Sequence, residues 1–217
     1  MKSTTLKITL LAFMAAATFS CKNAEKETEV AVENPAEATE AAVEYNIDPA
    51  ASEIKWEGEK PTTKHFGTIS LNSGVFHLNN GAVEAGKFEI DMSSINVQDL
   101  EGEYKENLEA HLKGTVEGKE GDFFNIKEFP TSKFELTGIE NNVVKGNLTI
   151  KGKTNAIEFP ATVTTEGDKM TLKSEAIELD RTKWDINFGS KSVFDNLGDK
   201  FISDIMKIEV SLVANKA

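Results

Sequence analysis

Cysteine is almost absent from this sequence, and histidine and arginine are scarce. The 217 residues include one cysteine, three histidines and one arginine. A single cysteine excludes an intramolecular disulfide and any zinc or iron–sulfur site built from several cysteines, so an apolar core must hold the fold together. The three histidines, His65, His77 and His111, lack the spacing of a metal motif on one helix or strand, and no metal site is predicted.

Positive charge is also in short supply. Lys and Arg number 24 against 36 Asp and Glu, which gives a formal net charge of -12. Nucleic acid is bound through clustered cations, so this balance argues against a nucleic-acid partner, and it also disfavours an anionic membrane surface. With 39% apolar and 28% charged residues the composition is that of one globular domain carrying a tail.

The longest apolar run is too short to cross a membrane. It extends from Ile8 to Phe19, follows Lys2 and Lys7, and ends at Ser20-Cys21. A bilayer needs about 20 residues, so residues 1–20 are interpreted as a signal peptide. The small residue before the only cysteine resembles a lipoprotein processing site and predicts lipidation of Cys21, hence a membrane anchor in the bacterial cell envelope. The alternative is a cleaved soluble precursor with a free Cys21.

Residues 21–44 lack both glycine and aromatic side chains. From Lys22 to Glu44 there are seven Glu, two Lys and many Ala. So little apolar area cannot offset the entropy of ordering the chain, which predicts an acidic flexible tether, with a helix as the alternative because Ala and Glu favour helices. The globular domain is expected over residues 45–217.

The rest of the chain alternates apolar and polar residues with a period of two, which is typical of half-buried strands. The apolar positions include Ile54 and Trp56; Ile69 and Leu71; Phe76 and Leu78; Phe88, Ile90 and Met92; Phe134 and Leu136; Leu148 and Ile150; Ile157, Phe159, Ala161 and Val163; Met170 and Leu172; Ile208, Val210 and Leu212. Turns are expected at Asn72-Ser73-Gly74, Asn79-Asn80-Gly81, Glu140-Asn141-Asn142, Gly152 and Glu166-Gly167-Asp168. Short strands joined by tight turns indicate an all-β, antiparallel domain.

One segment has helical periodicity instead. Between Gln98 and Lys113 an apolar residue recurs every fourth position, at Leu100, Tyr104, Leu108 and Leu112. Acidic residues come early and basic residues late, which suits the helix dipole. A second short helical turn is expected around Ser192 to Leu197. A single helix cannot cover so much apolar sheet, so we expect the sheet to close into a barrel of about eight strands.

The interior of such a barrel is either a packed core or a pocket for one small ligand. The residues expected to point inward and line a pocket are Trp56, Phe88, Ile90, Phe134, Leu148, Ile150, Phe159, Trp184 and Val210. Catalytic signatures are missing. The Gly146 to Thr154 stretch has five residues between its glycines where a phosphate-binding loop has four, and there is no G-x-S-x-G elbow. No catalytic residue or cofactor is predicted, and an enzyme acting on a molecule bound in the pocket is the weakest hypothesis.

Two polar residues remain as candidates at the barrel rim. Arg181 is the only arginine in a chain with 23 lysines. This suggests that its planar guanidinium is needed for contacts that a lysine cannot make. It is expected near one barrel end, paired with a strand-end carboxylate as a structural ion pair or, alternatively, with a ligand headgroup. His65 is interpreted as a rim histidine hydrogen-bonded to the backbone rather than as an acid or base.

The order and spacing of several stretches resemble the YceI-like, polyisoprenoid-binding, lipocalin-like proteins of the bacterial envelope, in their lipoprotein subgroup. The stretches are Tyr45 to Ser52 with Trp56; His65-Phe-Gly-Thr68; Gly86 to Ser93; His111-Leu-Lys113; Asp122-Phe-Phe124 and Phe129-Pro130; Gly146 to Thr154; Asp180-Arg-Thr-Lys-Trp184; and Leu197 to Lys200. The resemblance implies an extended eight-stranded antiparallel barrel with one helix in a connection. It also implies a long apolar pocket for an isoprenoid tail, such as a quinone or polyprenyl lipid, and no catalytic activity.

The leading hypothesis from the sequence is therefore an envelope lipoprotein, periplasmic or surface-exposed, whose barrel binds or sequesters an apolar isoprenoid lipid. A flexible prenyl chain contributes mainly buried area and needs few directed contacts, so an apolar tube suits it. The second hypothesis is a stress or interaction module with a packed core and no ligand.

Overall fold

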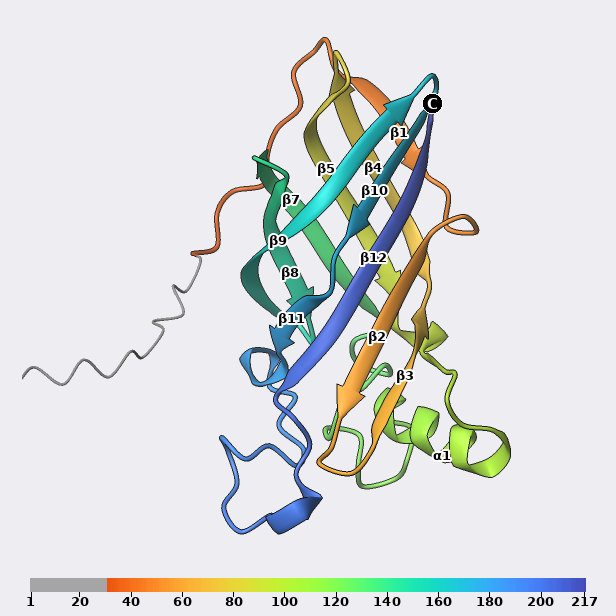
Figure 1. Cartoon of the computed structure of the whole chain (residues 1–217), viewed down its shortest axis with the longest axis vertical. Helices are drawn as coiled ribbons and strands as arrows, with labels where there is room; N and C mark the ends of the chain where they lie inside the picture. Colours follow the sequence, from red (N-terminus) through yellow and green to blue (C-terminus); the bar gives the residue numbers. More distant parts are fainter. Residues whose placement is uncertain (1–30) are drawn as a thin grey trace, which may run out of the picture.

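The computed structural model describes residues 31–217, so the predicted signal peptide, Cys21 and the first part of the predicted tether lie outside the described residues. The strands, shown in Figure 1, are β1 (Val43–Ile47), β2 (Glu53–Glu59), β3 (Lys64–Ile69), β4 (Leu71–Asn79), β5 (Ala82–Asp91), β6 (Asn96–Val97), β7 (Thr131–Glu140), β8 (Val143–Ile150), β9 (Lys153–Glu166), β10 (Lys169–Ser174), β11 (Ile177–Asp180) and β12 (Ile205–Lys216). The helices are α1 (Gly102–Lys113) and the 3-10 turns η1 (Met92–Ser94), η2 (Arg181–Trp184) and η3 (Gly198–Lys200).

The sheet closes on itself as an antiparallel barrel. Hydrogen-bonded neighbours follow the order β1-β4-β5-β7-β8-β9-β10-β12, and pairing of β1 with β12 completes a ring of eight strands. The long strand β12 pairs with β10 and then β11 along one edge, and with β1 and then β2 along the other. The predicted all-β barrel with one α-helix in a connection is confirmed.

Most predicted turns are tight hairpins. Asn80 and Gly81 both have positive φ, 51° and 83°, as a two-residue turn matching the strand twist requires. Lys151 and Gly152 do the same between β8 and β9. The turn expected at Asn72-Ser73-Gly74 was wrong, because these residues continue β4 through a register shift against β5. Gly74 is needed there for close packing, since a Cβ would clash with Ile47 and Phe88.

The barrel interior has two halves of different character. The upper half, the end that carries the C-terminus in Figure 1, is a packed core. Its buried side chains are Tyr45, Phe76, Leu78, Leu136, Val144, Met170, Leu172, Leu212 and Ala214. The lower half faces α1, the 114–130 loop and the 186–204 loop, and it is closed by these connections rather than by a further layer of strands.

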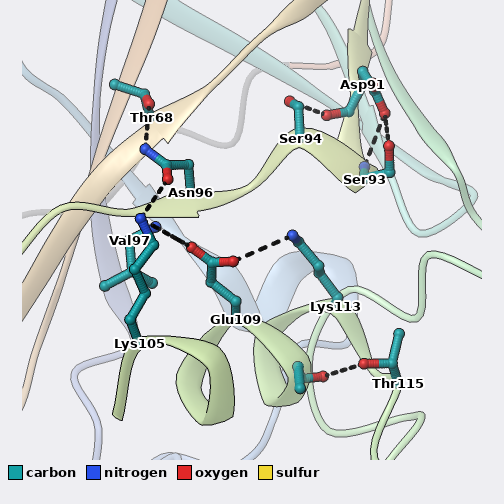
Figure 2. A network of polar contacts seen from close by, with 11 residues as sticks. Thr68, Asp91, Ser93, Ser94, Asn96, Val97, Lys105, Glu109, Lys113 and Thr115 are labelled. Atoms are coloured by element: carbon teal, nitrogen blue, oxygen red, sulfur yellow. Dashed lines mark hydrogen bonds and ion pairs between the residues drawn. The ribbon is translucent and has the colours of Figure 1, made fainter. Parts of the chain in front are cut away.

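Helix α1 begins at Gly102, four residues after the predicted start, and its apolar face is only partly buried. Tyr104 is 79% exposed, whereas Leu112 packs against the core. Polar contacts also fix the helix (Figure 2): Glu109 accepts a 2.9 Å hydrogen bond from the Val97 N–H of β6, and Lys105 donates to Asn96 at 2.8 Å. Val97 is itself fully buried, so its N–H depends on Glu109.

The described part of the predicted tether runs along the outer barrel wall (Figure 1). Asn147 of β8 exchanges hydrogen bonds with the main chain of Glu33, the Ala36 N–H donates to the Leu136 carbonyl at 2.8 Å, and Thr39 donates to Glu84 of β5. These bonds place residues 33–39 against β8, β7 and β5 before β1 begins. Within residues 31–217, the only α-helix is too short and polar to span a bilayer.

Substituting Glu109 tests whether polar contacts hold α1 to the barrel. Glu109→Ala is expected to lower the free energy of unfolding by about 1–3 kcal/mol, because the buried Val97 N–H loses its acceptor. Urea unfolding gives the energy, and hydrogen exchange of the α1 amides shows the loosened helix. Glu106→Ala, an exposed position on the same helix, is the control and should change stability by under about 0.5 kcal/mol. Equal effects from both variants would contradict this role of Glu109.

Candidate functional site: an apolar cavity in the lower half of the barrel

The lower half of the barrel encloses a cavity of about 150 Å³. Eight of the nine residues predicted to line a pocket do line it: Trp56, Phe88, Ile90, Phe134, Leu148, Ile150, Phe159 and Val210. The strand register thus places these side chains as the sequence pattern indicated. An engineered cavity of similar size in another protein stays dry and binds benzene, so this volume accommodates about one isoprenoid unit without rearrangement.

Trp184 is the exception among the predicted lining residues. It is buried, but it is not part of the cavity wall, and its Nε1 donates to the Leu148 carbonyl at 3.0 Å. The reason is that β11 ends at Asp180, whose side chain caps the 3-10 turn η2. The chain therefore leaves strand geometry before Trp184, and alternation no longer predicts which way the ring points.

Sequence reasoning missed the lining residues that come from connections. Leu112 of α1, Phe123 and Phe124 of the 114–130 loop, and Ile186 and Ile202 of the 186–204 loop all contribute to the wall. These segments lack the period-two pattern, so only their apolar character could have drawn attention to them. The helical turn expected around Ser192 to Leu197 is displaced: one helical hydrogen bond joins the Phe194 N–H to the Ser190 carbonyl, and the 3-10 helix η3 starts at Gly198.

The cavity is most accessible at its lower end. Lining residues near the ends of β2 and the start of β12, including Gly58, Ser203, Ile205 and Met206, are only half-buried, whereas Phe134, Leu148 and Phe159 are buried. Two methionines, Met92 and Met206, belong to the wall. Unbranched thioether side chains repack easily, so the wall can adapt to an occupant larger than the free volume.

Arg181 lies at the base of the cavity and holds the 186–204 loop. Its guanidinium donates to three main-chain carbonyls: Nε to Ser203 at 2.9 Å, Nη1 to Ile186 at 2.5 Å and Nη2 to Ile202 at 3.1 Å. The carboxylate partner expected at a strand end is Asp204, whose Oδ1 is 3.5 Å from Nη2. The guanidinium of Arg181 thus bonds the loop backbone and ties both loop ends to η2, and a lysine could not reproduce this geometry.

The surroundings of Arg181 and Asp204 shift the pKa values of both side chains. Burial lowers the pKa of Arg181, while Asp204 and Asp180 oppose that shift, and a guanidinium remains protonated all the same. Burial raises the pKa of Asp204, but hydrogen bonds from Ser190 and Ser192 and the charge of Arg181 outweigh it, so the net pKa lies below its ordinary value. Asp204 therefore stays ionised and keeps the buried cation compensated.

Two histidines join the segments that close the lower end. His111 of α1 is 2.7 Å from Asp122, and its ring contacts Phe123 and Phe188 edge-on, at centroid distances of 5.0 and 4.9 Å. At this side chain, α1 therefore meets both the 114–130 loop and the 186–204 loop. His65 of β3 lies outside the cavity wall, and its partner is the Asp99 carboxylate at 2.7 Å rather than the expected backbone group.

The cavity wall carries little charge. Its ionisable members are Arg181, already engaged by the loop, and Glu57, which pairs with Lys64 at 3.1 Å and with Lys207 at 3.8 Å. Across residues 31–217, no three His, Cys, Asp or Glu side chains are grouped as a metal site. The arrangement is suited to holding an uncharged apolar molecule by burial of its surface.

Replacing Arg181 by lysine tests the role of the guanidinium. Arg181→Lys keeps the charge but cannot reach three carbonyls, so we expect the free energy of unfolding to fall by about 2–4 kcal/mol and the melting temperature by about 5–15 °C. Thermal unfolding followed by circular dichroism measures this. An unchanged melting temperature would show that Arg181 is one more ordinary cation.

Comparison with known proteins supports the fold and identifies the family. The crystal structure of BcnA from Burkholderia cenocepacia has a TM-score of 0.56 at 23% identity, covering 78% of this chain and 99% of BcnA. A polyisoprenoid binding domain from Saccharophagus degradans has a TM-score of 0.56 at 13% identity, covering 81% of this chain and 99% of that domain. These likenesses show a shared fold. No curated protein sequence matches the chain. A family model described as a YceI-like domain matches residues 45–214, and the chain therefore belongs to the YceI-like family.

Proposed function

We propose that this protein is an envelope lipoprotein whose barrel binds an apolar, isoprenoid-type lipid, such as a quinone or polyprenyl lipid, and that it acts by binding rather than by catalysis. The observation that carries the proposal is the cavity in the lower half of the barrel, which has an apolar wall and no free charge. The polyisoprenoid binding domain named above has the same fold, which supports an isoprenoid ligand here.

The cavity suits one segment of an apolar chain. The free volume of about 150 Å³ takes roughly one isoprenoid unit, and the methionines of the wall, Met92 and Met206, can repack around a longer chain. Each square ångström of apolar ligand surface buried contributes about 25 cal/mol, so several units along the wall give substantial affinity without directed contacts. A charged headgroup has no free counter-charge at the wall and would lie outside it.

Lipid analysis tests this function directly. Protein purified from several expression hosts is extracted with organic solvent, and the extract is analysed by mass spectrometry for neutral isoprenoid lipids. We expect such a lipid in at least one preparation. Repeated absence from all hosts would instead support the ligand-free module.

A cavity-filling substitution locates the bound lipid. Ile150→Trp places an indole in the cavity, so lipid occupancy should fall while the free energy of unfolding changes by less than about 1 kcal/mol. Val144→Trp is the matched control, on the same strand and face but in the packed upper half, where overpacking should cost about 1–3 kcal/mol. If Ile150→Trp destabilises the barrel as much as the control does, the lower half is a packed core.

The envelope anchor is tested at Cys21, which lies outside the described residues. Cys21→Ser removes the thiol that would carry the acyl chains and is expected to release the protein from the membrane fraction while the barrel remains folded. Cell fractionation with immunodetection, together with circular dichroism of the released protein, checks both statements. Continued membrane association would show that another attachment exists.

A further inference from the structure

Exposed apolar side chains are concentrated on the 186–204 loop. Phe188, Val193 and Phe194 are 41%, 47% and 49% exposed, and they are three of the seven large hydrophobic residues exposed within residues 31–217. The loop projects from the lower end of the barrel in Figure 1. A soluble protein seldom gathers such side chains on one segment unless the segment meets a partner.

The loop holds these side chains outward through its own bonds. Ser190 is fully buried, the Phe194 N–H donates to its carbonyl at 2.9 Å, and Ser192 Oγ donates to Asp204 at 2.6 Å. The Ile202 N–H bonds the Gly189 carbonyl at 2.8 Å, and Arg181 fixes both loop ends. The exposed rings are therefore part of an ordered platform.

The platform is continuous with the cavity. Ile186 and Ile202, at the two ends of the loop, belong to the cavity wall. The ring of Phe188 lies 5.5 Å from that of Phe123, which also lines the cavity. Apolar surface therefore extends from the exposed loop into the barrel interior.

Charge also distinguishes this loop from the rest of the protein. Residues 186–204 contain two Lys, at 191 and 200, and three Asp, at 195, 199 and 204. Because Asp204 is paired with Arg181, the remaining charges of the loop balance, in a chain of net charge -12. Lys191 lies over the Phe201 ring, 3.3 Å from its centroid. Aromatic rings beside long cationic side chains suit the boundary between lipid headgroups and acyl chains.

The chain that precedes the described residues is long enough for this orientation. Eleven residues lie between Cys21 and Glu33, so these two positions are at most about 40 Å apart. Glu33 is bound to Asn147, only three residues before the lower end of β8. An acylated Cys21 would therefore allow the lower end of the barrel to reach the same membrane.

We propose that the 186–204 loop docks on the surface of a lipid bilayer, with Val193 and Phe194 in the interfacial layer, Phe188 at its edge, and the mouth of the cavity facing the membrane. Docking in this orientation lets an apolar chain pass between bilayer and cavity with little exposure to water. The bilayer on which the loop docks is zwitterionic, because anionic lipids would repel the rest of the protein surface, which is acidic.

Tryptophan fluorescence with brominated lipids tests the docking. Phe194→Trp and, as a second variant, Val193→Trp are made in the full chain and mixed with phosphatidylcholine vesicles whose acyl chains carry bromine. After subtraction of the emission of the unsubstituted protein, the added emission should fall by roughly twofold relative to unbrominated vesicles, since the indole enters the layer that bromine reaches. Tyr104→Trp, exposed at the same end but on the acidic helix α1, is the matched control and should be unaffected.

The outcomes separate docking from lipid binding. Absence of quenching in both loop variants, or equal quenching of Tyr104→Trp, overturns the docking proposal. A blue shift of the loop variants that depends on protein concentration and needs no vesicles also overturns it, because a second copy of the chain would then cover the loop. Lipid is also extracted from the same samples. Quenching without any extracted lipid would contradict the proposed function but not docking. Extracted lipid without quenching would contradict docking but not the proposed function.

Discussion

Closure of the sheet through β12 is the constraint on which the rest of the molecule depends. This strand pairs with β10 and β11 on one edge and with β1 and β2 on the other, so every strand of the ring has two neighbours. Closure removes exposed sheet edges and forces alternate side chains into a limited interior volume. How well those side chains fill the volume then decides whether a given level of the barrel is core or cavity.

The interior is filled to different extents in the two halves of the barrel. In the upper half, large residues such as Phe76, Leu136 and Met170 fill the interior and supply the stability that a single-cysteine protein must obtain from packing. In the lower half, the side chains leave about 150 Å³ unfilled. A packed core and a cavity therefore coexist along one barrel, and the first supports the second.

Polar contacts position the segments whose apolar side chains close the lower end. Glu109 fixes α1 to β6, His111 joins three connections, and Arg181 binds carbonyls at both ends of the 186–204 loop. Directed bonds of this kind set the position of a segment without filling the space behind it. This explains how the end of the barrel can be ordered while the cavity beneath it stays open.

The strands, most of the hairpin turns and the inward register could be predicted from the sequence, because a period of two and Asn-Gly turns are local signals. The sequence therefore identified eight cavity residues and the special use of Arg181. It misjudged Trp184 and the Asn72–Gly74 segment, where a 3-10 turn and a register shift replaced the regular pattern.

Three properties could be learned only from the folded chain: which level of the barrel is left unfilled, which carbonyls Arg181 binds, and where the exposed aromatic rings of the 186–204 loop lie. These properties depend on volumes and distances between segments far apart in the chain, and local sequence patterns carry no information about them.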